Sequence, residues 1–172
     1  MLTEVEKNFL DNLDYKSSNR AVRIYPWDAR SLDVGQEIVA EIQQMAPNLE
    51  ILFGGSAPLR IAGEKDIDIS VYCPKPEQAK YVPKLETLFG KPASEGESHT
   101  GWVFEREGFH VTVYLTDLAS PNTKVQKELF ELLQSHPELA KEYEQIKLEQ
   151  NGKSYKEYQI AKYEFYHKVL GL

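Results

Sequence analysis

The chain has 172 residues, of which 41% are hydrophobic and 27% charged, an ordinary composition for one globular domain. There are 27 acidic and 20 basic side chains, so the net charge at pH 7 is −7. Because non-specific nucleic-acid binding depends on a basic surface, this charge argues against a protein that coats DNA or RNA. No apolar run approaches the ~18 residues that span a bilayer, and we expect no contact with a membrane.

The cysteine content and the first residues indicate the compartment. Cys73 is the one cysteine, so the chain cannot form an internal disulfide, and no Cys/His pattern has the spacing of a zinc site. Residues 1–6 lack the basic and apolar regions of a signal peptide. We therefore expect a reduced, cytoplasmic protein.

Hydrophobic periodicity, caps and helix breakers predict the order of the elements. In chain order these are a helix at 3–13, a loop at 14–20, a strand at 22–25, a helix from Ser31 or Asp33 to about Met45, a strand at 49–53, a strand at 66–72, a helix at 77–89 or from Pro83, a loop at 90–101, hairpin strands at 102–104 and 109–115, and helices at 122–134, 137–150 and 155–170. Strands alternate with helices at first, and the last third is helical.

The strand at 66–72 carries the most informative residues, Asp66 and Asp68. Positions i and i+2 of a strand point to the same face, so the two carboxylates project together, ~6–7 Å apart along the strand. Two like charges at this spacing favour a cation between them. Their hard oxygen ligands suit Mg²⁺ or Mn²⁺, which bind one or two carboxylates together with substrate phosphates.

A turn of Gly54, Gly55 and Ser56 precedes this strand by ten residues. Glycines let backbone N–H groups approach a phosphate, and the Ser56 hydroxyl adds a donor. Lys65, next to the acid pair, is a further candidate for holding phosphate oxygens. Each motif alone more often has only a structural role. The acid pair would then lie on a solvent-exposed strand face, the Gly-Gly-Ser segment would form a tight turn, and Lys65 would balance the local negative charge. Their order along the chain favours a site for a nucleoside triphosphate and a metal ion.

The second hairpin strand contributes His110 and Thr112, which share one face. If that face adjoins the acid pair, His110 would ligate metal or act as an acid or base, and Thr112 would line the phosphate site. A hydrogen-bonded strand histidine without such a role is an equally good interpretation.

Several motifs resemble the GrpB-like family of the nucleotidyltransferase superfamily, which is related to DNA polymerase β. Gly55-Ser56 followed by Asp66-Ile67-Asp68 resembles the superfamily signature, and the family segments are similar to 25–30 and to the His-Pro-Glu…Glu-Tyr…Lys helix at 136–147. The resemblance covers about residues 22–172. It implies that Asp66 and Asp68 hold the metal and that Lys162, in the last helix, reaches the substrate.

The resemblance also implies a third carboxylate, which active superfamily members normally supply from a neighbouring strand. The strand at 109–115 offers no Asp or Glu, and Glu105, Glu107 and Asp117 lie near its ends.

In the last helix, tyrosines and lysines alternate in a way that would stack bases and contact phosphates. The simpler interpretation, which we favour, is that the tyrosines cover the sheet.

Together these features predict an α+β fold, with a nucleotidyltransferase-type mixed β-sheet covered by helices and a helical C-terminal third. Residues 1–20 would form a helical leader and 21–172 a single GrpB-like domain. The leading hypothesis is a metal-dependent enzyme that moves a nucleotidyl group from a nucleoside triphosphate to a small-molecule or protein acceptor. The alternatives are an inactive module that binds a nucleotide or phosphometabolite and a protein-interaction domain.

Overall fold

A five-stranded mixed sheet lies at the centre of the fold in the computed structural model, which describes residues 2–172. Its strands are β1 (Glu50–Gly54), β2 (Asp66–Tyr72), β3 (Ser94–Glu95), β4 (His99–Arg106) and β5 (Phe109–Thr116). Its helices are α1 (Glu4–Asp11), α2 (Tyr15–Asn19), α3 (Arg30–Met45), α4 (Ser56–Leu59), α5 (Lys75–Phe89), α6 (Pro121–Ser135), α7 (Pro137–Glu149) and α8 (Tyr155–Leu170).

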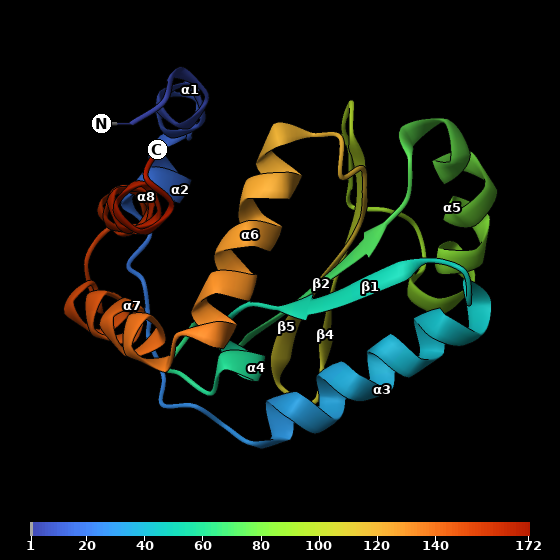
Figure 1. Cartoon of the computed structure of the whole chain (residues 1–172), viewed down its shortest axis with the longest axis horizontal. Helices are drawn as coiled ribbons and strands as arrows, with labels where there is room; N and C mark the ends of the chain where they lie inside the picture. Colours follow the sequence, from blue (N-terminus) through green and yellow to red (C-terminus); the bar gives the residue numbers. More distant parts are fainter. Residues whose placement is uncertain (1) are drawn as a thin grey trace.

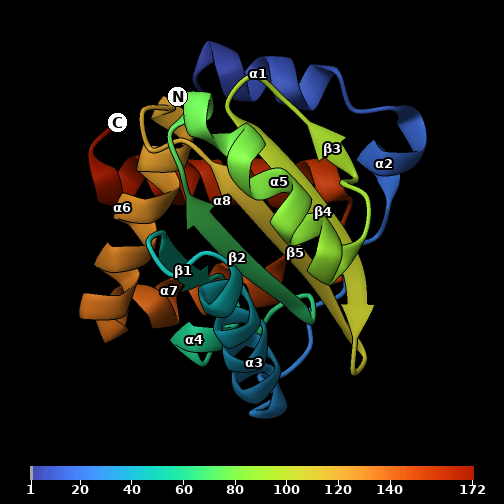
Figure 2. The same ribbon diagram turned by 90° about the vertical axis from the view of Figure 1, so that its right-hand side faces the viewer.

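The strand order is β1-β2-β5-β4-β3. Only the central pair, β2 and β5, runs parallel; the other neighbours are antiparallel. The parallel pair requires a crossover, which α5 and the β3–β4 hairpin provide (Figures 1 and 2). The predicted α+β fold, with a mixed sheet and a helical C-terminal third, is confirmed.

Residue alternation in β2 and β5 gives the sheet one apolar and one polar face. Ile67, Ile69 and Val71 are fully buried, and so are their counterparts on β5. Helices α3 and α5 cover this apolar face, in front of the sheet in Figure 2. The polar face carries Asp66 and Asp68 and lies on the side of α6, α7 and α8 (Figure 1). The fold therefore brings the C-terminal helices to the side of the acid pair.

The C-terminal helices have a small core of their own, built around Tyr143 and Phe165, whose stacked rings lie 5.1 Å apart. Leu129 and Leu133 of α6 and Ile61 from the loop after α4 complete it. The expectation that the α8 aromatics cover the sheet is corrected in part. Much of the aromatic surface of α8 packs against α7 and α6, because the sheet face below α8 is polar.

Two expectations near the N-terminus are wrong. The segment 14–20 contains helix α2 (Tyr15–Asn19) rather than a loop, because the Asp14 side chain caps the helix by accepting a hydrogen bond from the Ser17 backbone N–H. Residues 22–25 form no strand: Ala21 and Tyr25 each make an isolated bridge, to Ser154 and Gly63. The partners of this segment are loop residues, so no ladder can extend.

Three element boundaries also differ from the expectations. The region 90–101 contains β3 and the start of β4, because Ser94 and Glu95 pair with Thr100 and Gly101. Helix α5 begins at Lys75 and keeps Pro83 inside it. Helix α3 begins at Arg30, and neither Ser31 nor Asp33 caps it. None of the helices in the described chain is long and apolar enough to cross a membrane.

Helix α1 has one buried apolar side chain and two polar contacts with α8, one of which joins Asp11 to Lys156 at 3.6 Å. Leu10 is buried, and Glu6 Oε1 lies 2.9 Å from Nε2 of the buried His167. The other oxygen of Glu6 accepts the Thr3 backbone N–H at 2.7 Å, as the capping box predicts. The proposed division into a leader at 1–20 and a domain at 21–172 stays a prediction.

We expect Glu6→Ala to loosen α1 on α8, because it removes both the cap and the partner of His167 while Leu10 and the Asp11–Lys156 pair remain. The matched control is Glu4→Ala, whose exposed carboxylate pairs with Lys7 on the same helix. Amide hydrogen exchange in α1 should become about tenfold faster or more in Glu6→Ala, given typical values for caps and charged hydrogen bonds. Equal protection in the two variants would contradict this role of Glu6.

Candidate functional site

The acid pair lies on the polar face of the sheet, on the central strand β2. In the parallel register with β5, Asp66 is opposite His110 and Asp68 is opposite Thr112. On the other side, Asp68 pairs with Gly54 at the end of β1. Both carboxylates are partly buried. The structure thus brings Gly54, Asp68 and Thr112 together across three strands, as the sequence motifs predict for one site.

Gly55 explains why the turn before the site needs a glycine. Its φ of 75° and ψ of −161° belong to a region that only glycine adopts readily. A Cβ added at Gly55 would lie 2.6 Å from Oδ2 of Asp68, closer than nonbonded atoms allow. The Asp68 carboxylate therefore packs directly on the Gly55 backbone, and the two motifs form one structural unit.

Ser56, the next residue, is buried and bonded to a helix distant in the sequence. Its hydroxyl accepts a hydrogen bond from Nζ of Lys147 on α7. Lys147 is itself only 5% exposed. Ser56, predicted as a phosphate donor, thus acts here as an acceptor and positions a buried ammonium group beside the acid pair.

The charges at the site are strongly coupled. Burial, followed by the negative charge of Asp66, raises the pKa of Asp68 to about 7, although Lys162 and Lys147 act against the shift. Burial and the positive charge of Lys162 lower the pKa of Lys147 to about 8, against the pull of the carboxylates. The surroundings of Asp68 and Lys147 therefore favour the charged forms of these side chains less than water does, as is common at functional sites.

Lys162 on α8 faces the same carboxylates. Burial by itself would lower its pKa, but the surrounding tyrosine hydroxyls, with that of Tyr143 first, and the Asp66 carboxylate hold it well above its usual range. Its ammonium group also lies 5.0 Å from the centre of the Tyr158 ring. The predicted substrate-binding lysine therefore lies close to the acid pair.

Glu64 is a third carboxylate at the site, which the sequence reasoning missed. Burial and the charge of Asp66 raise its pKa, and Lys162, Arg20 and Lys147 oppose the shift. Its side chain is 20% exposed and its Oε1 lies 3.6 Å from Nη2 of Arg20. Its position two residues before Asp66 was the available signal, although β2 begins only at Asp66 and Lys65 between them has a left-handed φ of 61°.

Two of the candidate third carboxylates from the sequence, Glu105 and Asp117, are engaged elsewhere. Glu105 lies 2.8 Å from Nδ1 of His110, and Asp117 accepts backbone N–H groups of Lys75 and Ala119 at 2.8 Å each. Within residues 2–172, no three side chains of His, Cys, Asp or Glu lie together in a way that would hold a metal ion. The donors at the acid pair fit a Mg²⁺ or Mn²⁺ ion that takes two carboxylates and completes its shell with substrate oxygens and water.

Two predicted site residues lie at the margin of the site. His110 is half-exposed and paired with Glu105 on β4, although it stands opposite Asp66 in the register. Lys65 is exposed, with its ammonium group 4.6 Å from the centre of the Tyr25 ring. Both side chains are therefore held by neighbours other than the acid pair.

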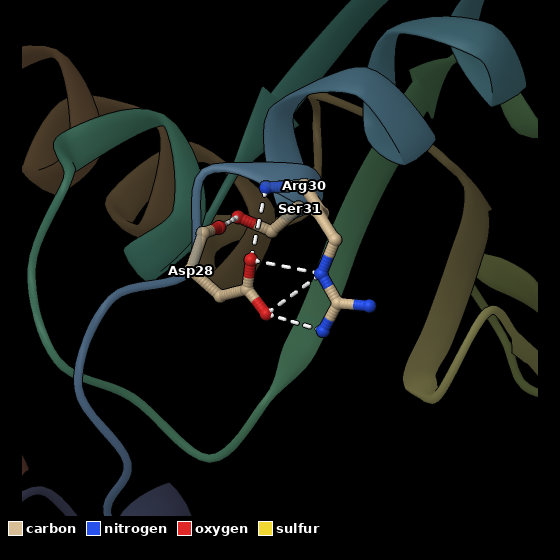
Figure 3. Close-up of polar contacts among 3 residues, drawn as sticks. All are labelled: Asp28, Arg30 and Ser31. Carbon is tan, nitrogen blue, oxygen red and sulfur yellow. Dashed lines mark hydrogen bonds and ion pairs between the residues drawn. The ribbon is translucent and has the colours of Figure 1, made fainter.

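Pro26, Trp27, Asp28 and Ser31 of the segment 25–31 line a pocket that shares Asp66 and Ser56 with the site. The Trp27 indole N–H donates to the Ala57 carbonyl at 2.9 Å, which joins this segment to α4. Figure 3 shows the Asp28 carboxylate bound to the Arg30 guanidinium and backbone, while Ser31 donates to the Asp28 carbonyl. These bonds fix the start of α3 against the site.

Lys147 was named in the sequence only as part of a family motif, and its position carried a usable signal. It follows Tyr143 by four residues and so lies on the buried stripe of α7. A lysine on such a stripe indicates a buried charge with a partner. Glu144, beside it, accepts the Ala62 backbone N–H at 2.6 Å and fixes the loop before β2 to α7.

Comparison with known proteins gives the following relationships. The family model described as "GrpB protein" matches residues 21–171. The crystal structure of the conserved protein GrpB from Enterococcus faecalis is 13% identical, with a TM-score of 0.59 over 73% of this chain and 81% of that chain. The MgGTP-bound Cid1 poly(U) polymerase is 12% identical, with a TM-score of 0.46 over 70% of this chain and 41% of that chain. No curated protein matches the chain.

The GrpB structure shares the fold, and the family model covers nearly all of the chain from the end of α2 to α8. The motifs that carried the resemblance, in the segments 25–30, 55–68 and 136–147, all lie within that match. The chain therefore belongs to the GrpB family, as its sequence motifs predict.

Proposed function

We propose that this protein is a metal-dependent nucleotidyltransferase, which moves a nucleoside monophosphate group from a nucleoside triphosphate to a hydroxyl of a small-molecule or protein acceptor. One observation carries the proposal: two carboxylates on the same face of β2, of which Asp68 packs on a glycine turn, lie near two lysines from α7 and α8. This arrangement places carboxylates that can bind a metal ion beside ammonium groups that can bind the phosphates of a nucleotide.

The acidic and the basic residues would bind different parts of the ligand. Asp66 and Asp68 would hold Mg²⁺ or Mn²⁺, which neutralises charge on the transferred phosphate when bound. Lys162 would bind oxygens of the β- and γ-phosphates, and the buried Lys147, held by Ser56, would add positive charge beside them. Gly54 and Thr112, which flank Asp68 in the sheet, and Gly55 would lie nearest to the α-phosphate.

The chemistry requires no covalent intermediate on the protein. The acceptor oxygen forms a bond to the α-phosphorus as the bond from that phosphorus to the bridging oxygen breaks. Pyrophosphate leaves, and the acceptor proton passes to solvent. The chain contributes by positioning the groups in line and stabilising the charge on the leaving pyrophosphate.

A second candidate function is a module that binds a nucleotide or phosphometabolite without turning it over. It is favoured by Thr112, which occupies the position on β5 opposite Asp68 where a third carboxylate would stand. In either case we propose that the ligand is a small anion with a metal ion and that the protein acts in the cytoplasm, where the buried Cys73 stays reduced.

Calorimetry with Mn²⁺ and each of the four common nucleoside triphosphates tests the proposal. The wild-type protein should bind at least one Mn²⁺-nucleotide, and Asp66→Asn should weaken this binding about tenfold or more. Asp33→Asn, an exposed carboxylate of α3, is the matched control and should bind as the wild type does. Equal affinity of the wild type and Asp66→Asn would contradict the assigned metal role.

Release of pyrophosphate separates the two candidate functions. Transfer predicts metal-dependent release of pyrophosphate in the presence of a cell extract as the source of acceptor, and loss of that release in Asp66→Asn. Tight nucleotide binding without release above the Asp66→Asn background would favour the binding module.

A further inference from the structure

Arg20 lies immediately before the part of the chain that the family model matches, at the C-terminal cap of α2. Its backbone is fixed to the start of α8: the Arg20 carbonyl accepts the Tyr155 N–H at 2.8 Å, and Ala21 forms a bridge with Ser154. Val22 adds a hydrogen bond from its N–H to the Lys153 carbonyl at 2.8 Å. The base of the Arg20 side chain is therefore held in a defined place.

The Arg20 side chain is oriented but not enclosed. Its guanidinium carbon lies 4.7 Å from the centre of the Tyr155 ring, which keeps the guanidinium plane in place. Its Nη2 lies 3.6 Å from Oε1 of Glu64, beyond a normal hydrogen bond. The side chain remains 54% exposed, so its donors can bind another group.

Arg20 also lies on the side of the molecule that carries the acid pair. It lies near Glu64, which precedes Asp66 by two residues. Its stacking partner Tyr155 begins α8, the helix that carries Lys162. Arg20 therefore lies beside the segment that leads into the acid pair.

The charges around the acid pair leave a role for a further cation. Three carboxylates, Glu64, Asp66 and Asp68, are matched by three cations, Lys147, Lys162 and Arg20. A divalent cation and a nucleoside triphosphate would together add net negative charge. Lys147 is buried and bonded to Ser56, whereas Arg20 is more than half exposed and loosely paired.

We propose that Arg20 binds the phosphate tail of the nucleoside triphosphate and thereby extends the nucleotide site beyond the family-matched domain. The inference rests on the proposed function, because it takes the nucleotide to lie at Asp66 and Asp68. A guanidinium offers parallel N–H donors that match two phosphate oxygens, and it exchanges its loose contact with Glu64 for them. Residues 1–20 then contribute a side chain to ligand recognition.

The test compares affinities for nucleotides that differ only in the phosphate tail. Calorimetry with Mn²⁺ measures the Kd of the tightest-binding triphosphate and of the monophosphate with the same base, for wild type, Arg20→Ala, Arg20→Lys and the control Arg23→Ala. Arg23 is exposed and neighbours Arg20 in sequence. Thermal unfolding of each variant confirms that it is folded.

Arg20→Ala should weaken triphosphate binding about 10- to 100-fold, the range of charge-assisted hydrogen bonds, and monophosphate binding less than threefold or so. Arg20→Lys should recover part of the loss, and Arg23→Ala should show none. If Arg20→Ala binds the triphosphate like the wild type, or loses both nucleotides equally, the assignment of Arg20 is overturned while the proposed function stands. A wild type that binds no Mn²⁺-nucleotide overturns both.

Discussion

Asp68→Asn should stabilise the ligand-free protein at pH 8 and abolish metal binding. The reason is the pKa of Asp68, which folding raises from the ordinary value of 3.8 to about 7. The unfolded chain loses this proton near pH 4, and the folded chain holds it until about pH 7. The ionised carboxylate therefore disfavours the folded state increasingly from about pH 4 to pH 7, and the full effect is present at pH 8.

The expected gain for Asp68→Asn is on the order of 2–4 kcal/mol at pH 8, because one pKa unit corresponds to about 1.4 kcal/mol and the site is partly exposed. For a chain of this length the gain corresponds to a rise in Tm of about 5–10 °C. At pH 4 the two proteins should unfold at nearly the same temperature, because Asp68 is protonated in the folded protein.

Thermal unfolding at both pH values, with and without Mn²⁺, checks this result. Added Mn²⁺ should raise the Tm of the wild type and leave that of Asp68→Asn unchanged. Asp33→Asn is again the control. A variant that is less stable than the wild type at pH 8 would show that Asp68 is a structural ion-pair partner instead.

Gly55→Ala should disrupt the site, although the substitution adds only one methyl group. Its Cβ would lie 2.6 Å from the Asp68 carboxylate, and its φ of 75° is strained for any residue with a side chain. Backbone strain of this kind costs about 1–3 kcal/mol. We expect displacement of Asp68 to add about 1 kcal/mol or more and to weaken Mn²⁺ binding at least tenfold, because the carboxylate pair is separated.

The chain offers a matched control in Gly90, whose φ of 80° and ψ of −160° nearly equal those of Gly55. A Cβ at Gly90 meets no atom within 4 Å. Gly90→Ala therefore carries the same backbone strain without the contact to Asp68. Chemical denaturation and Mn²⁺ calorimetry of the two variants isolate the contact. Equal losses of stability and unchanged Mn²⁺ binding would mean that Asp68 moves aside freely.

Elements with a strong local pattern were predicted closely from the sequence. The strand at 66–72 and the helix at 155–170 agree with β2 and α8, because alternation and breakers mark both ends. The segment 22–25 failed for a physical reason. Its apolar residues match a strand, but its hydrogen-bond partners belong to loops at 63 and 153, which no local pattern reveals.

The positions of some residues of the candidate site also follow from the sequence, whereas those of others do not. The relation of Asp66 to Asp68 follows from the strand period of two, and their relation to Gly54 and Gly55 follows from the order of the motifs. Lys147 and Arg20 could not be placed, because their positions depend on how α7, α8 and α2 pack on the polar side of the sheet. Periodicity shows that Lys147 is buried, but it does not show that Ser56 is its partner.

The bond between Ser56 and Lys147 joins residues 91 positions apart, and Lys162 and the acid pair are further apart still. During synthesis, the strand that carries the carboxylates leaves the ribosome well before the helices that carry the lysines. A nascent chain that ends before α7 holds Glu64, Asp66 and Asp68 without those two lysines. The proposed nucleotide site is therefore completed only when α8 has docked.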